Sequence, residues 1–172
     1  SYDVLENRIV FPIRDDYGNL LSFKGRTCEK NYKDKDIPKF ISYYPCYNNN
    51  YLFGLYENKE AINKADEIFI AEAEKSVMIM DSMGINNVLA VNKKNISSIQ
   101  IKKILKLHKA VVLMLDNDVQ LEEILCECDK FRRLIDVYYI HDILNLLDEK
   151  DSPCDKGLNV FQKLYKECKF KF

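Results

Sequence analysis

The 172-residue sequence has no long apolar run, no C-x₂-C cysteine pair and no excess of charge of one sign. A membrane-spanning helix needs roughly 18 apolar residues, and no run approaches that length, so no membrane span is expected. No signal peptide is visible either, and the chain begins Ser1-Tyr2-Asp3 without methionine, so we expect an excised fragment. The formal net charge of −1 demands neither nucleic acid nor membrane, although a local basic patch is compatible with it.

The cysteines are not arranged for zinc. None of the six forms a C-x₂-C pair, and both histidines lie far from any cysteine-rich cluster, so no zinc site is expected in this fragment. An even number of cysteines allows disulfides, but the surrounding segments look intracellular and favour reduced structural thiols. The cysteines are Cys28, Cys46, Cys126, Cys128, Cys154 and Cys168.

Apolar residues make up 47% of the chain and charged residues 31%, which predicts a packed core with a solvated surface. The amino-terminal part is rich in β-forming residues. Arg8–Arg14 and Leu20–Arg26 flank the turn residues 15–19, in which Gly18 can take a positive φ, and we predict a hairpin there. Residues 28–38 are polar and predict a surface loop.

From Glu67 onward, short apolar segments alternate with segments of helical spacing. This order predicts βαβ units and a mainly parallel sheet with helices on both faces, preceded by the small β-rich part. Ser97 and Gln100 form a capping-box pattern, and Met78, Met80 and Met83 are expected in the core. The predicted strands are Glu67–Ala71, Asn87–Val91, Ala110–Leu115 and Asp136–Ile140, and the predicted helices cover 57–65, Glu74–Met83, 98–108, Leu121–Leu134 and about 155–167.

The architecture is therefore predicted to be α/β (α+β overall), with a β-rich subdomain at 1–60 and a mainly parallel sheet at 61–150. A short carboxyl-terminal segment at 151–172 carries the last helix.

Carboxylates follow several of the predicted strands. The stretch "VVLMLDND" ends in Asp116 and Asp118, Glu72 follows another strand, and Asp142 follows a third. Because the carboxyl ends of parallel strands meet at one edge, these acids would repel each other unless a cation such as Mg²⁺ offset their charge. Two such ions can stabilise the attacking and leaving oxygens of phosphoryl chemistry. The alternative is that Asp-Asn-Asp only forms a turn, with Asp118 capping the next helix.

These motifs resemble a known fold. Ile68–Ser76, followed by Met83–Asn86, resembles the first motif of the Toprim fold, and Asp116 with Asp118 resembles its second motif. The Toprim fold is shared by bacterial primases, topoisomerases and some nucleases.

The flanking segments resemble bacterial or phage DnaG-type replicative primases in particular. "RIVFPIR", Gly18 and Gly25-Arg26 are similar to the segment that precedes Toprim in that family. The order of the matches, over about residues 7–157, is their specific feature. Further similar segments are Pro38–Ile41, Tyr51–Tyr56 and Lys150–Asp155, the last resembling a third acidic motif.

The resemblance implies synthesis of short RNA primers on a single-stranded DNA template from ribonucleoside triphosphates, in the cytoplasm of a bacterium or a phage-infected cell. Glu72 would be a general base or metal-positioning acid, and Asp116 and Asp118 would bind Mg²⁺ or Mn²⁺. A replicative helicase would be contacted through regions that this chain lacks, as it lacks the family's zinc module. The remaining implied residues are Asp151 and Asp155 at a second metal position and Arg26 and Lys39 at template or nucleotide phosphates.

Some of these assignments have a simpler alternative. Arg26 and Lys39 are equally compatible with ordinary solvated cations, and Asp142 is placed only by its position after a strand. The aromatic residues of the segment 43–51 could stack bases, but packing is the favoured interpretation.

The sequence departs from the family pattern at several positions. Ala73 stands in place of a Gly, Ser76 in place of a further Asp, and Val119-Gln120 in place of Ala-Gly. These departures indicate a divergent member. They keep two alternatives open: a catalytically weak Toprim module that binds DNA or a replisome partner, and a Toprim nuclease.

Overall fold

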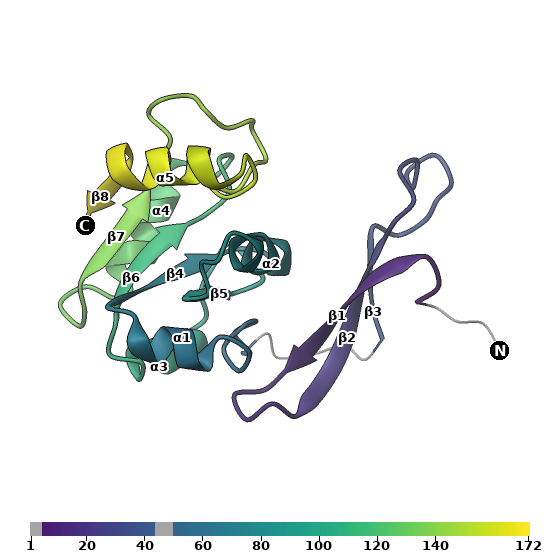
Figure 1. Ribbon diagram of the computed structural model, residues 1–172, viewed down its shortest axis with the longest axis horizontal. Coiled ribbons are helices and arrows are strands. Elements are labelled where there is room, and N and C mark those ends of the chain that lie inside the picture. The colour runs from purple at the N-terminus through teal and green to yellow at the C-terminus, as the bar shows by residue number, and fades with distance from the viewer. Residues whose placement is uncertain (1–4, 44–49) are drawn as a thin grey trace.

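The computed structural model describes residues 5–43 and 50–172, and its strands form two separate sheets (Figure 1). The first sheet is antiparallel, in the order β1-β2-β3. The predicted hairpin is present, with Arg8 opposite Thr27, and the predicted loop 28–38 contains only turns. The strands are β1 (Arg8–Arg14), β2 (Leu20–Thr27) and β3 (Phe40–Ser42).

The second sheet carries five strands in the order β5-β4-β6-β7-β8. Neighbouring strands from β5 to β7 are parallel, and β8 closes the edge in the antiparallel direction. The strands are β4 (Glu67–Ala71), β5 (Val88–Ala90), β6 (Ala110–Met114), β7 (Val137–Ile140) and β8 (Lys169–Lys171). The predicted α/β fold class, with a small β-rich part before a mainly parallel sheet, is confirmed.

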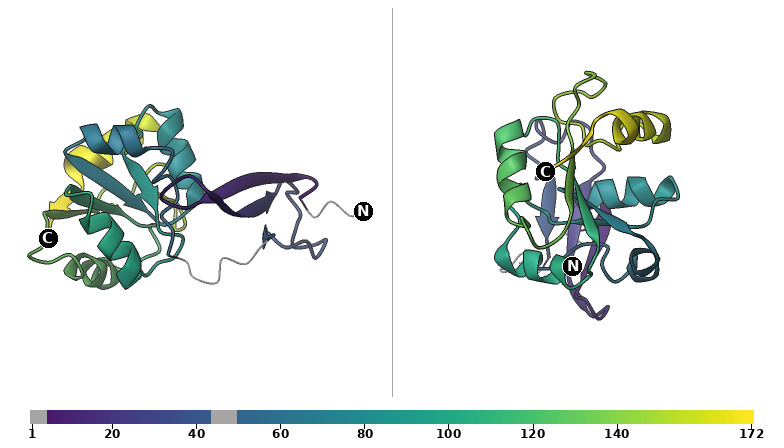
Figure 2. Two further views of the ribbon diagram at one scale, coloured as in Figure 1. Left: turned by 90° about the horizontal axis from the view of Figure 1, so that it is seen from below. Right: turned by 90° about the vertical axis from the view of Figure 1, so that its left-hand side faces the viewer.

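Helices cover both faces of the second sheet. Helices α3 and α4 pack on one face and α2 and α5 on the other (Figure 2). Helix α1 contributes Ile62 to the same hydrophobic cluster as α3 and α4. The helices are α1 (Lys59–Lys64), α2 (Glu74–Ser82), α3 (Ser98–Leu105), α4 (Leu121–Asp129) and α5 (Leu158–Glu167). Among the described residues, no helix is long and apolar enough to cross a membrane.

The two faces produce two cores because successive strand residues point in opposite directions. In β4, Ile68 and Ile70 join the cluster under α3 and α4, whereas Phe69 and Ala71 join the cluster under α2 and α5. Strands buried on both faces must be apolar at every position, which is why these segments read as continuous apolar runs.

Met78 was expected in the core, and this expectation is wrong. Val77 and Met80 face the sheet from α2, and Met78 is turned away from both, leaving 49% of it exposed. Met80 is fully buried, and the partly buried Met83 packs against the same cluster. A helix on one face of a sheet can bury only one stripe of its surface.

Several predicted boundaries also need correction. Helix α4 ends at Asp129, because turns occupy the next residues and leave Leu134 61% exposed. Helix α3 ends at Leu105, and α5 begins at Leu158, after the positive-φ residue Gly157. Strand β8 was not predicted, since three residues with alternating lysines carry little strand signal.

The amino-terminal sheet is joined to the rest by specific contacts. Phe11 and Ile13 pack with Tyr51 and Phe53 in a third hydrophobic cluster. At the hairpin turn, Gly18 lies against the Tyr56 ring, and a Cβ atom there would lie 2.5 Å from that ring and require it to move. The cysteines among the described residues are free thiols, and Cys46 lies outside the described residues.

Candidate active site at the carboxyl edge of the parallel sheet

The sheet register brings the predicted acids of two strands to one edge. Strands β4 and β6 are parallel neighbours, with Ala71 opposite Met114. Glu72 follows the first strand directly, and Asp116 and Asp118 follow the second within four residues. This is the edge at which ligands bind in open α/β sheets.

The charges of these acids act on one another. The pKa of Asp116 is raised to about 6, because burial and, to a smaller extent, the charges of Asp118 and Asp155 raise it more than Lys75 and Lys94 lower it. Such effects on the pKa of Asp116 require the carboxylates to lie close to it.

Glu72 belongs to the same cluster. Burial raises the pKa of Glu72, the charge of Asp116 adds to the rise, Lys94 lowers it, and Asp118 raises it again. Glu72, Asp116, Asp118 and Asp155 therefore form one group of interacting carboxylates, which we call the acidic edge.

Two buried oxygens of the acidic edge have no hydrogen-bond partner among the described residues, but one of them, Asp155 Oδ1, forms an ion pair with Lys75 at 2.9 Å. Glu72 Oε2 is buried and finds no donor among the described residues. A buried carboxylate oxygen left unpaired is unfavourable, and a divalent cation or a bound donor would satisfy it. The donor set, which consists of carboxylate oxygens, fits a hard cation such as Mg²⁺.

The acidic edge is not a complete protein cage for a metal. Within residues 5–43 and 50–172, no group of three or more His, Cys, Asp or Glu side chains is arranged to hold a metal ion. Mg²⁺ is usually bound by one or two carboxylates, several waters and substrate phosphates, so an incomplete set of protein ligands is compatible with this cation.

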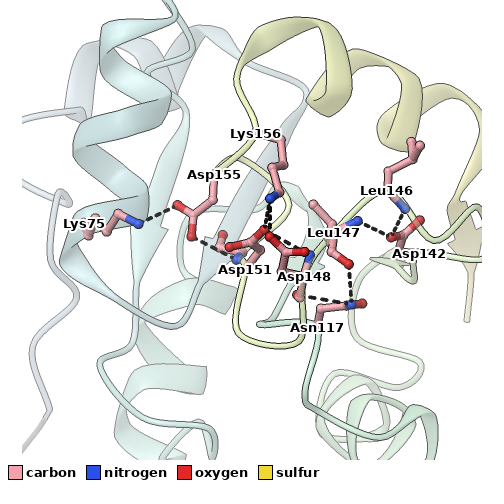
Figure 3. Close-up of polar contacts among 10 residues, drawn as sticks. Lys75, Asn117, Asp142, Leu146, Leu147, Asp148, Asp151, Asp155 and Lys156 are labelled. Carbon is pink, nitrogen blue, oxygen red and sulfur yellow. Dashed lines mark hydrogen bonds and ion pairs between the residues drawn. The ribbon is translucent and has the colours of Figure 1, made fainter.

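The third acidic segment lies beside the segment that carries Asp116 and Asp118. The backbone N–H of Asn117 donates to the carbonyl of Asp151 at 2.9 Å. The side-chain amide of Asn117 also faces the carbonyls of Leu147 and Asp148 (Figure 3). Asn117, which separates the two aspartates in sequence, thus connects their loop to the third acidic segment.

The two aspartates of the third segment have different surroundings. Asp155 forms an ion pair with Lys75 of α2 at 2.9 Å and accepts a hydrogen bond from the Ser152 N–H at 3.2 Å. Its charge raises the pKa of Asp116, so Asp155 belongs to the acidic edge.

Asp151 faces Lys156 instead, at 3.0 Å, and accepts a hydrogen bond from the Asp148 N–H (Figure 3). Burial raises the pKa of Asp151, but these hydrogen bonds and the Lys156 charge outweigh that effect and lower it. The structure therefore places Asp151 in a local lysine contact beside the acidic edge.

Two further acids are explained by local structure. Asp142 accepts hydrogen bonds from the backbone N–H groups of Leu144, Leu146 and Leu147, which occupies both of its oxygens. Figure 3 shows the bonds from Leu146 and Leu147. Asp142 therefore organises its own loop, and no role at the acidic edge is needed to explain why an aspartate stands at this position. The alternative role of Asp118 as a helix cap is wrong, because Gln120 is the N-cap of α4.

Arg26 and Lys39 lie on the amino-terminal sheet and share the ring of Phe40. The Arg26 guanidinium lies 5.9 Å from the ring centroid and the Lys39 ammonium 5.8 Å, and both residues line a pocket of about 270 Å³. Lys24 also lies over this ring, and it pairs with Glu74 of α2 at 2.9 Å. This basic cluster is thereby connected to the helix that follows Glu72.

Three residues of the site were missed in the sequence. Lys75 and Asn117 acquire their roles only through contacts with a segment some 35 to 80 positions away, which no local pattern reveals. Lys94 could have been predicted from the sequence, because it follows β5, and the carboxyl end of β5 lies at the same edge of the sheet. The predicted aromatic segment 43–51 lies largely outside the described residues.

Comparisons with known proteins agree with this geometry. Residues 1–59 match the family model of the DNA primase catalytic core, N-terminal domain. The DNA primase of Buchnera aphidicola is 32% identical over 122 residues, which cover 69% of this chain and 20% of that protein. The DNA primase of Lactococcus lactis is 32% identical over 120 residues, which cover 68% of this chain and 18% of that protein. The chain thus spans about one fifth of the length of these relatives.

A solved structure shares the fold over nearly the whole chain. The Aquifex aeolicus primase, solved with its zinc-binding and RNA polymerase domains, has a TM-score of 0.77 at 23% identity and covers 99% of this chain and 42% of its own. From its sequence matches and its fold, the chain belongs to the family of DnaG-type DNA primases.

Proposed function

We propose that the chain is the catalytic core of a DNA primase, which synthesises short RNA primers on single-stranded DNA from ribonucleoside triphosphates. The observation that carries the proposal is the convergence of Glu72, Asp116 and Asp118 at one sheet edge, where the charges of both aspartates raise the pKa of Glu72 and the charge of Asp118 raises the pKa of Asp116. Family membership supports this reaction in preference to a Toprim nuclease, because residues 1–59 match the primase amino-terminal domain. The activity would place the protein in the cytoplasm of a bacterium or a phage-infected cell.

The acidic edge would bind Mg²⁺ or Mn²⁺ through Asp116 and Asp118, with Asp155 beside them. When bound, the cation would neutralise phosphate charge and acidify the attacking 3′-hydroxyl of the primer. Glu72 would accept the proton of that hydroxyl or help position the cation, and its unpaired buried oxygen is free for either task. Lys75 and Lys94, whose charges reach the acidic edge, would be within range of the substrate's phosphates.

The basic cluster around Phe40 would hold the template. Arg26 and Lys39 would contact backbone phosphates, and the 39% exposed Phe40 ring would offer a face to a base. A DnaG primase catalytic domain has been solved bound to single-stranded DNA, and it shares this fold with a TM-score of 0.76 at 18% identity, covering 99% of this chain and 54% of its own.

A second candidate function, a Toprim module that binds DNA with little catalysis, has one observation in its favour. Lysines pair with both aspartates of the third acidic segment, Lys75 with Asp155 and Lys156 with Asp151. Ammonium groups at these positions could take the place of a second divalent cation and so reduce turnover.

One experiment distinguishes the two proposed functions. The chain is incubated with a single-stranded template, labelled ribonucleotides and Mg²⁺ or Mn²⁺, and template binding is measured in parallel. Metal-dependent primer synthesis supports the primase. Template binding with metal uptake but without synthesis would favour the binding module.

A further inference from the structure

A pocket lies away from the acidic edge, between α1 and α3. It has a volume of about 410 Å³, which suits several side chains of a partner. We call it the α1–α3 groove. Its walls come from the segment 55–63, from the segment 99–107 and from Asp16 at the hairpin turn.

The rim of the α1–α3 groove is basic. Lys59, Lys102 and Lys106 are exposed, and none has an ion pair or hydrogen bond through its side chain among the described residues. A fourth lysine, Lys103, is already neutralised by Asp16 at 2.6 Å and fixes the hairpin turn to α3. Among the residues that the structure describes, three ammonium groups around one opening therefore lack a negative partner.

The floor of the groove is aliphatic. It is formed by Leu55, Ile62, Ile99 and Leu107, and Ile99 remains 44% exposed. No aromatic or arginine side chain from residues 5–43 or 50–172 lines the groove. Single-stranded nucleic acid is usually held by aromatic stacking together with cations, so this lining does not favour a nucleic acid occupant. An aliphatic floor within a basic rim is complementary to apolar side chains flanked by acids.

We propose that the α1–α3 groove docks an acidic, amphipathic segment of a partner protein. The segment's Leu- or Ile-type side chains would cover the floor, and its Asp or Glu residues would pair with Lys59, Lys102 and Lys106. This interaction is independent of the proposed polymerase reaction, because none of the groove residues belongs to the acidic edge or the basic cluster around Phe40.

The test uses a fluorescent synthetic peptide with Leu at helical spacing on one face and Glu on the other. Its binding to the wild-type chain is compared with binding to Lys102→Glu/Lys106→Glu. The control variant, Lys163→Glu/Lys166→Glu, makes the same change of charge on α5. We expect binding about tenfold weaker in the groove variant, because two attractions become repulsions, and nearly unchanged in the control. Thermal melts check that both variants remain folded.

A second variant and a second peptide test the apolar floor. Ile99→Ser should weaken binding of the peptide, whereas Ile143→Ser, at an exposed site elsewhere, should not. A peptide of the same composition with its leucines scattered should bind poorly. The proposal is overturned if the groove and control variants lose affinity equally, or if the scattered peptide binds as well. It is also overturned if the groove variant loses affinity only for an oligo(dT) strand, since the groove would then be a nucleic acid track.

Discussion

Glu72 and Asp116 carry their negative charges in surroundings that oppose ionisation. Burial contributes most to the raised pKa of each. Neighbouring carboxylates add to it, Asp116 and Asp118 in the case of Glu72, and Asp118 and Asp155 in the case of Asp116. Cation binding and protonation therefore compete at the same oxygens. The site should lose divalent cations as the pH falls through the raised pKa of Asp116, about 6.

The raised pKa of Asp116 makes a prediction about stability without metal. Between about pH 4 and pH 6, the Asp116 carboxyl is ionised in the unfolded state but still protonated in the folded state. Above pH 6 it is ionised in both states, and its buried charge lowers the free energy of unfolding. Asp116→Asn should therefore raise the free energy of unfolding by about 1–3 kcal/mol at pH 7 and change it little below pH 4. Urea unfolding in EDTA at both pH values measures this. A variant that is less stable at pH 7 would contradict the burial of the charge.

Metal binding should reverse the loss of stability that the ionised carboxylates cause. In wild type, Mn²⁺ should raise the melting temperature because it binds only the folded state. Asp116→Asn/Asp118→Asn should remove this shift, whereas the control Asp34→Asn/Asp36→Asn, in the exposed loop, should keep it. Thermal melts with and without Mn²⁺ decide the matter. If Mn²⁺ still raises the melting temperature of the double variant, these two aspartates do not bind the metal.

At the scale of elements, Gly54 holds the segment before α1 against the sheet. Its φ is +87°, and a Cβ atom there would lie 3.0 Å from Val77 Cγ1 and 3.1 Å from the Val88 carbonyl oxygen. The glycine thus allows the chain to pass between α2 and β5. This explains in physical terms why a glycine occupies the segment "YLFGLY".

Gly54→Ala should destabilise the fold by about 2–4 kcal/mol, because backbone strain and a steric clash act together. Gly84→Ala is the matched control. Gly84 also has a positive φ, +79°, but no atom lies within 4 Å of its added Cβ, so only the strain of about 1–2 kcal/mol remains. Chemical denaturation of both variants measures the difference. Equal losses would show that the contacts around Gly54 relax without cost.

Elements with a strong local signal were predictable. β4 and β6 are continuously apolar and bounded by polar residues, and the capping box of Ser97 and Gln100 forms as expected. Glu72, Asp116 and Asp118 were placed at one edge from strand order alone, since parallel strands end together, whereas Asp155 followed only from the family resemblance. What could not be predicted depends on distant partners. Strand β8 exists because β7 offers an edge, and Lys75 meets Asp155 only after folding.

On the scale of the whole molecule, the two sheets bring unlike charges near each other. The basic cluster lies on the amino-terminal sheet, the acids lie on the other, and Lys24 joins them through Glu74. A nucleic acid strand held by the first could thus present its end to the second. The net charge of −1 hides this separation, which is why composition alone gave no indication of a nucleic acid partner.

Template binding should therefore depend on local charge. Arg26→Ala/Lys39→Ala should weaken binding of an oligo(dT) strand and reduce the slope of log affinity against log salt by about 1.4, roughly 0.7 for each lost phosphate contact. Lys163→Ala/Lys166→Ala is the control, and its slope should match wild type. Titrations by fluorescence anisotropy at several salt concentrations provide the slopes. An unchanged slope in the first variant would identify Arg26 and Lys39 as ordinary surface cations.

The central claim is that the acidic edge catalyses primer synthesis, and Glu72→Gln tests it most directly because it keeps size and removes charge. Incorporation of labelled ribonucleotides on a single-stranded template should fall about 10²–10⁴-fold, as expected for loss of a general base or metal-positioning group. Melting temperature and template binding should stay near wild type. Glu122→Gln, in the first turn of α4, is the control for a mere helix-terminus effect and should retain activity. Near-normal synthesis by Glu72→Gln beside an active wild type would contradict the account.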